Sequence, residues 1–191
     1  GMAALFAMLA WAASGSTSEL RLMQLPSRPH PNLGPSDVVR TLCLALQHNN
    51  VPRERAGLSR LYDFCTFEAR SALTARQGAR TRERFEQYAH SPAFAELVNS
   101  AHHHVAPATI IPGTQTRGAL ATVIVSVEGF AADGSRGGLP GEAADVAPKR
   151  FRWLLQQERR PPHEGCWFVN EVVALEQWFL FNGDSGSTTT D

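Results

Sequence analysis

The sequence predicts an α+β domain in which helices from the first half of the chain pack on an antiparallel sheet from the second half. Two observations lead to this fold class. Apolar residues recur every three or four positions up to about residue 98, and at every second position after about residue 103. The helical segments also all precede the strands, whereas a doubly wound nucleotide-binding fold would alternate them.

The first helix is predicted to begin at Ser36 or Asp37 and to end near Asn50. The segment before it, Leu22–Pro35, is rich in proline and glycine and reads as an extended linker. Either Ser36 or Asp37 can cap the helix by accepting a hydrogen bond from a free backbone N–H group. Four apolar residues then follow at helical spacing: Val38, Val39, Leu42 and Leu46.

Three further helices are predicted. Residues 53–66 carry one apolar stripe, and helices also start at Thr81 and at Ser91, where Pro92 suits the first helical position. Residues 69–78 are rich in alanine, serine, glutamine and glycine, and we expect a loop there.

About four strands are predicted in the second half. Their segments are rich in β-branched and aromatic residues and bounded by turn residues: 103–111, 117–127, 149–158 and 166–175. The segment 130–148 is rich in glycine, alanine, aspartate and proline, without periodicity, and is expected to be a long loop.

The expected organisation is one domain over residues 35–181, preceded by an apolar segment and linker (1–34) and followed by a disordered tail (182–191). Residues 2–13 are apolar but shorter than the roughly 20 residues that span a bilayer. A docked helix, a targeting remnant and a secretory signal are the three readings, in that order. Trp178–Phe181 is expected to pack on this segment or on a second subunit.

Composition excludes some classes of function. Basic and acidic residues number 18 each, so the chain lacks the positive charge of a nucleic-acid-binding protein. Hydrophobic residues make up 43%, enough for a core, and we expect a soluble protein without a membrane span. The three cysteines lie far apart in sequence and form no disulfide framework, which favours a reducing compartment, either the cytoplasm or a plastid or other organelle.

Several segments together resemble a known family. These are the opening helix PSDVVRTLCLALQHNN, Asp63-Phe64, the run Phe85…Tyr88…Ser91-Pro92…Phe94, the alternation Trp153…Gln157, and Gly165-Cys166-Trp167. Over about Pro35–Leu175 the chain resembles an uncharacterised family of nuclear-transport-factor-2-like (cystatin-like) domains from plants, algae and some bacteria.

The resemblance implies a cone, in which a curved sheet wraps the helices and leaves a cavity at its open end. It also implies a homodimer formed through the sheets. Relatives with this fold include isomerases, dehydratases, epoxide hydrolases and scaffolds without catalysis, so the fold leaves the function open.

A pocket on the concave side would be lined by aromatic residues and a few polar ones. Period-2 alternation places Gln157 on the same face as Phe151 and Trp153. In the last strand one face contains Asn170 and the other Glu171, and either can point inward. The predicted pocket residues are Tyr62, Phe85, Tyr88, Phe151, Trp153, Gln157, Phe168 and Asn170.

The catalytic candidates are weak ones, Glu171 and His104. A buried Glu171 would be tuned toward a general base, whereas a solvent-facing one would be ordinary surface. His102 and His104 share a face of their strand, but no third ligand accompanies them, so no metal site is predicted.

Other motifs also fall short of a site. The arginines at 76, 80, 82 and 84 are interleaved with Glu83 and Glu86, as in a solvated helix start. The sequence has no glycine-rich phosphate loop and no nucleophile elbow. No cofactor is predicted.

The sequence therefore favours a domain that binds a small apolar ligand or acts as a scaffold, without catalysis. One alternative is an isomerase, dehydratase or hydrolase with a carboxylate or histidine base in the cone. The other is a protein-interaction module that uses the sheet face.

Overall fold

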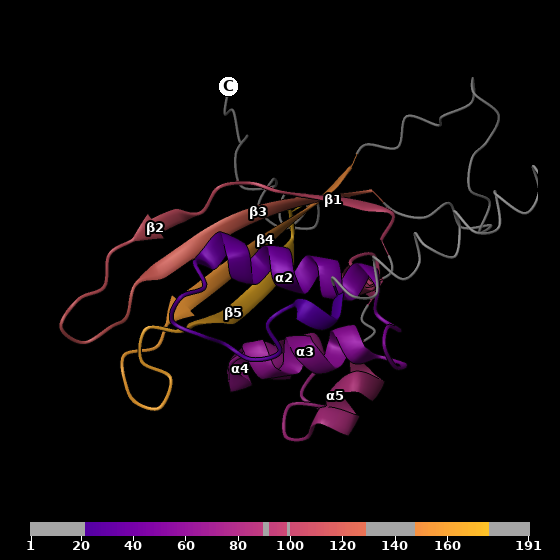
Figure 1. The fold of residues 1–191 in the computed structure, drawn as a ribbon, viewed down its shortest axis with the longest axis horizontal. Helices are drawn as coiled ribbons and strands as arrows, with labels where there is room; N and C mark the ends of the chain where they lie inside the picture. The colour runs from indigo at the N-terminus through magenta and orange to yellow at the C-terminus, as the bar shows by residue number, and fades with distance from the viewer. Residues whose placement is uncertain (1–21, 90–91, 99, 129–147, 176–191) are drawn as a thin grey trace, which may run out of the picture.

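In the computed structural model, residues 22–175 are described, apart from residues 90–91, 99 and 129–147. Five helices followed by five strands lie within them, so the α+β prediction is confirmed (Figure 1). Other predictions lie outside the described residues: the apolar segment 2–13, Ser91, almost all of the loop 130–148, Trp178–Phe181 and the tail 182–191.

Helix α2 spans Pro35–Gln47 and buries the predicted apolar stripe. Gly34 is its N-terminal flanking residue, and Pro35 occupies the first helical position. The predicted side-chain cap is therefore wrong. The Ser36 hydroxyl instead accepts a hydrogen bond from the backbone N–H of Ala108, at 3.0 Å, which ties the helix to the sheet.

Helices α3 (Ala56–Phe64) and α4 (Phe67–Leu73) follow in quick succession. Gly57 allows α3 to approach α2 closely, because a Cβ atom there would lie 2.2 Å from the backbone oxygen of Ala45. The loop prediction over residues 69–78 is wrong for its first part. The Thr66 side chain accepts a hydrogen bond from Ala69 N (3.2 Å) and caps α4. The low hydrophobicity of the segment gives no periodic signal for this helix.

Two short helices complete the helical half: α5 (Arg82–Tyr88) and α6 (Pro92–Ala95). Thr81 caps α5 as predicted, because its hydroxyl accepts a hydrogen bond from Arg84 N at 3.3 Å. None of the helices in the described residues is long and apolar enough to cross a membrane.

The sheet is open and antiparallel. Strand β3 (Leu120–Glu128) pairs with β4 (Lys149–Gln157), and β4 pairs with β5 (Trp167–Ala174). The predicted first strand is two short ones, β1 (His102–Val105) and β2 (Thr109–Ile111), which both pair with β3. Pro107 lies between them and offers no N–H group to the ladder.

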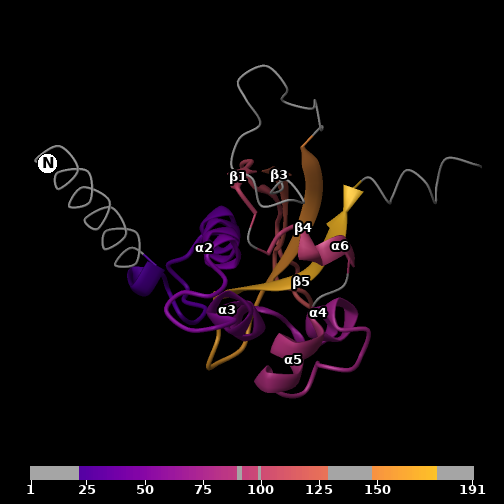
Figure 2. The ribbon, with the colours of Figure 1, turned by 90° about the vertical axis from the view of Figure 1, so that its right-hand side faces the viewer.

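The core lies between the helices and one face of the sheet, which we call the inner face (Figures 1 and 2). Buried side chains alternate along β3 and β4, and their neighbours project from the opposite, outer face. Figure 2 shows how strongly the strands twist between β3 and β5. A bulge between β4 and β5, where the register shifts between Leu154 and Leu155, interrupts the alternation in β5.

Candidate ligand groove at the edge of the sheet

The inner side of the sheet is filled by side chains where the concave pocket was expected. Phe85 and Trp153 are fully buried, and Phe151 is 1% exposed. All three belong to the same apolar core as the buried residues of α2 and α3. Tyr88, at the end of α5, is instead 39% exposed to solvent. These four residues are packing or surface residues in this arrangement.

The bulge decides the orientation of the last strand. Val169 pairs with buried Leu155, and Val172 pairs with buried Trp153, so both valines face the helices. Asn170 and Glu171 lie between them, and neither side chain points into the core. The prediction that one of these two residues points inward is therefore wrong, because the bulge inserts one extra residue into the alternation.

Glu171 lies on the outer face beside Arg152, and its Oε2 is 2.9 Å from Nη2 of that arginine. Its side chain is 43% exposed. Glu171 is therefore a partly hydrated, ion-paired residue of the outer face and does not line the core.

The three consecutive histidines divide between the two faces of β1. His104 is exposed and pairs with Ser126, and His102 pairs with Glu128, so both lie on the outer face. His103 points inward, and its buried Nδ1 has no hydrogen-bond partner among the described residues. Burial first, and then the neighbouring His102 and His48, lower the pKa of His103. No group of three metal-ligating side chains occurs in the part of the chain that the structure describes.

The three cysteines are free thiols in buried positions. Burial raises the pKa of Cys43 and of Cys65 to about 12, and it also raises the pKa of Cys166. Each is therefore a neutral thiol near pH 7 and a poor nucleophile.

A groove of about 740 Å³ runs beside the edge strand β5. The junction between α3 and α4 builds one of its walls. Cys65 forms a parallel bridge with Val169, and Thr66 N donates a hydrogen bond to the Val169 carbonyl oxygen at 2.9 Å. The Thr66 hydroxyl donates to Asn170 Oδ1 at 3.3 Å while it also caps α4. These bonds fix α4 against β5 and hold the groove open along the strand.

The helical wall is built around the ring of Tyr62. The guanidinium carbon of Arg70 lies 4.3 Å from the ring centroid, and the guanidinium carbon of Arg82 lies 5.9 Å from it. The Tyr62 hydroxyl donates to the Arg80 carbonyl oxygen at 3.0 Å, and Arg82 Nη2 lies 2.7 Å from Asp63 Oδ1. This wall is rigid and polar, with Glu68 as a further lining carboxylate.

The sheet wall consists of Gln156 and Phe168, which are paired residues of β4 and β5 and lie side by side on the outer face. The ring of His163, from the turn between these strands, meets Phe168 edge-on with centroids 5.4 Å apart. Glu158 Oε1 accepts hydrogen bonds from the backbone N–H groups of Arg159 (2.8 Å) and Arg160 (3.2 Å), which closes the turn.

Three of the eight residues predicted to line a pocket are in this groove: Tyr62, Phe168 and Asn170. Gln157 faces the other side and donates from Nε2 to the Gly165 carbonyl oxygen at 3.1 Å. The lining also includes four residues that the sequence did not predict: Thr66, Arg70, Gln156 and His163. The available signal was the Thr66 cap, which would have placed α4 and its junction in the structured part of the chain.

The groove thus combines aromatic surface, two carboxamides and an excess of carboxylates. Among its described residues it contains no nucleophile with a lowered pKa and no group of three metal ligands. No family model, curated protein or solved structure matches this chain.

Proposed function

We propose that this chain is a nuclear-transport-factor-2-like scaffolding domain that forms a homodimer through the outer face of its sheet. The order of helices before strands and the placement of the helices on one face of the sheet support the fold. The observation that carries the function is the outer face itself. Three aliphatic side chains lie around its centre, and no described helix lies over it.

The centre of the outer face contains three neighbouring aliphatic side chains: Ile124 on β3, Leu154 on β4 and Val173 on β5. Arg152 is the pairing partner of both Ile124 and Val173, and Leu154 lies next along β4. Ile111 extends the apolar surface at one end and is 53% exposed. A sheet face that only meets water normally carries polar residues, so a shared apolar centre favours a partner surface.

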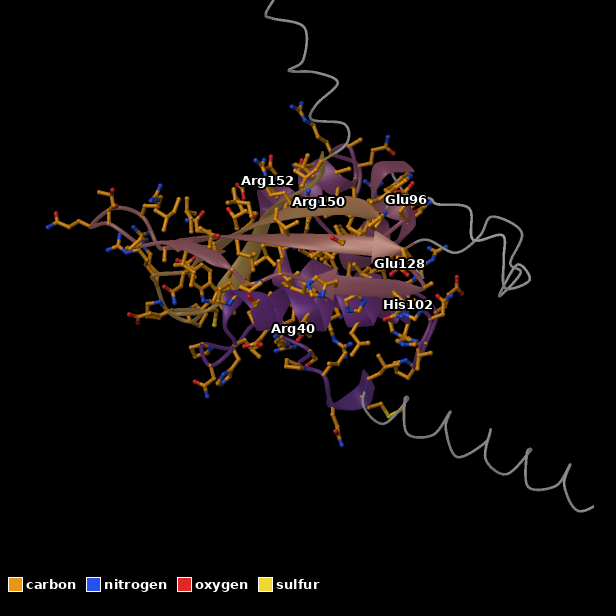
Figure 3. The ribbon with its side chains drawn as sticks, turned by 90° about the horizontal axis from the view of Figure 1, so that it is seen from above. Arg40, Glu96, His102, Glu128, Arg150 and Arg152 are labelled. Atoms are coloured by element: carbon orange, nitrogen blue, oxygen red, sulfur yellow. The ribbon has the colours of Figure 1, made fainter. Side chains whose placement is uncertain are left out.

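The charges around this centre suit a second copy of the same chain. Arg150 and Glu128 are exposed on neighbouring strands at one end of the face, as Figure 3 shows. Closer to the centre, Arg152 and Glu171 already neutralise each other. A twofold interface needs a self-complementary patch, and a patch that contains both signs fulfils this requirement.

The size of the face is compatible with a dimer. Strands β3 and β4 have nine residues each, which at about 3.3 Å per residue gives a length of about 30 Å. Four strands spaced at about 4.8 Å give a width of about 15 Å. Side-chain relief raises the accessible area above this projection, toward about 800 Å² per partner in a standard interface.

The experiment measures molar mass by light scattering over a range of concentrations. We expect the wild-type chain at twice the 20.9 kDa of one chain. Leu154→Lys should give one chain, because a lysine there pairs with Glu171 across the strands and keeps the fold while it blocks the interface. Ile110→Lys is the matched control, since Ile110 is 51% exposed and pairs with buried Ala121 on the other side of the sheet.

The control should remain dimeric. A wild-type chain that stays at the mass of one chain throughout would refute the proposal. So would a Leu154→Lys variant that remains dimeric and folded by circular dichroism.

A further inference from the structure

We infer that the groove between α4 and β5 binds a planar, uncharged heteroaromatic molecule that carries neighbouring hydrogen-bond donors and acceptors, of the nucleobase or nucleoside kind. This inference does not depend on the dimer, because the groove is formed by residues of a single chain. It lies at one end of the outer face, away from Ile124 and Val173, at the border of the proposed interface.

The size and the aromatic content of the groove indicate a small planar ligand. Its volume of about 740 Å³ falls within the range of pockets that hold small molecules, roughly 300–1,000 Å³. Phe168 and His163 meet at an interplanar angle of 74° and form an apolar corner beside β5. A flat ring can stack in such a corner irrespective of its substituents.

Two carboxamides give the corner its hydrogen-bonding pattern. Gln156 lies beside Phe168 and makes no side-chain hydrogen bond within the described residues, so both its oxygen and its NH₂ group are available. Asn170 uses Oδ1 to accept from Thr66, and this orients its NH₂ group as a donor. Carboxamides form paired hydrogen bonds with heterocycle edges that present a donor next to an acceptor, as glutamine and asparagine do with adenine.

The charge of the groove argues against an anionic ligand. Three carboxylates line it, at Asp63, Glu68 and Glu158, against the single guanidinium of Arg70. Arg82 neutralises only Asp63. Arg70 is also engaged, since it covers the Tyr62 ring and donates from Nε to the Thr66 carbonyl oxygen at 3.3 Å. A phosphate would therefore enter a field that is negative overall.

The test is an NMR titration of the ¹⁵N-labelled full-length chain with three neutral probes. These are adenosine, cytidine and nicotinamide, each at up to millimolar concentration. Adenosine monophosphate, which has the same base as adenosine plus a phosphate, is the anionic comparison. We expect saturable amide shifts at residues 66–70 and 156–170 with at least one neutral probe, and weaker binding of the monophosphate.

Variants then test the two recognition elements. Gln156→Leu should lower the affinity for the probe by about tenfold, which corresponds to about 1.4 kcal/mol of binding free energy. Phe168→Leu keeps apolar bulk but removes the ring, and should weaken it by a similar factor. Gln87→Leu makes the same exchange as the first variant on an exposed position of α5, outside the groove, and should leave the affinity unchanged.

Each contrary result has a definite meaning. No saturable shifts with any of the three neutral probes would overturn the inference, as would an unchanged affinity in both folded groove variants. Tighter binding of the monophosphate would also overturn it, in favour of an anion site. Repeating the titration on Leu154→Lys separates this result from the dimer proposal, because the groove should keep its affinity in a monomer.

Discussion

The two faces of the sheet differ although the same strands build them. Along β4, Phe151, Trp153 and Leu155 are at most 1% exposed, whereas Arg152 and Leu154, which alternate with them, remain partly accessible. Helices cover the inner face, and the described residues leave the outer face without a helical layer. The inner face therefore forms the core, and the outer face is the surface that we propose as the dimer interface.

The two faces also differ in where the candidate ligand groove lies. Among the described residues, the aromatic side chains of the inner face belong to the packed core. The groove forms where the outer face meets the α3–α4 junction, because there a helix lies beside the sheet edge without covering it. The buried face therefore stabilises the domain, and the groove that we propose as a ligand site lies at the border of the sheet.

The largest effect should come from the same substitution on neighbouring residues of opposite faces. Leu155→Ala removes a fully buried side chain and should lower the free energy of unfolding by about 2–5 kcal/mol. Leu154→Ala removes the same atoms from the outer face and should cost about 1 kcal/mol or less when measured on the monomer. Urea denaturation of both variants, at a concentration low enough that each is a monomer by light scattering, checks this contrast, and equal losses would contradict it.

A smaller effect concerns the pH dependence of the free energy of unfolding, which should differ for histidines on the two faces of β1. The pKa of His103 is lowered in the folded chain, so the unfolded chain binds the proton more readily. The free energy of unfolding should therefore be fully retained above the ordinary value of 6.5 and should decline as the pH falls below it. His103→Gln should flatten this decline in denaturation experiments at several pH values.

His104→Gln is the control for that experiment, because His104 projects from the other face of the same strand. Its pH profile should follow that of the wild-type chain. A His103→Gln profile with the original slope would assign the pH dependence to other groups, such as His48 and His102, which also act on the pKa of His103.

The smallest effect concerns the ion pair on the outer face. A double-mutant cycle on Arg152→Ala and Glu171→Ala should give a coupling energy of about 0.2–1 kcal/mol in the monomer, because both side chains are partly hydrated. The coupling should fall further at high salt. A coupling of several kcal/mol would mean that the outer face is far less hydrated than the exposed fractions indicate.

Much of the fold could be predicted because local signals agree with the tertiary structure. The stripe from Val38 to Leu46 and the alternation from Phe151 to Leu155 each follow the period of their element, and both stripes are buried. The Thr81 cap was equally clear. Helix α4 has few apolar residues and no periodic stripe that would predict it, and the β-branched residues on both sides of Pro107 favour one continuous strand over residues 103–111.

The groove could not be predicted for a different reason. Its residues come together through one register shift and one bridge between distant segments. The bulge opposite Leu154 and Leu155 turns Asn170 and Glu171 away from the core, and no local pattern marks where a strand gains an extra residue. The bridge from Cys65 to Val169 connects positions that are far apart in sequence. Reasoning from one strand at a time therefore placed the pocket on the inner face.

The same bridge has a consequence for aggregation. An exposed edge strand offers free backbone groups to other chains and can seed fibrous assembly. The hydrogen bond from Thr66 N occupies the Val169 carbonyl oxygen, and α4 packs alongside, so part of the β5 edge is already taken. At the opposite edge β1 and β2 are only four and three residues long and are separated by Pro107. In the proposed dimer, copies would meet face to face while both borders of the sheet resist strand-by-strand growth.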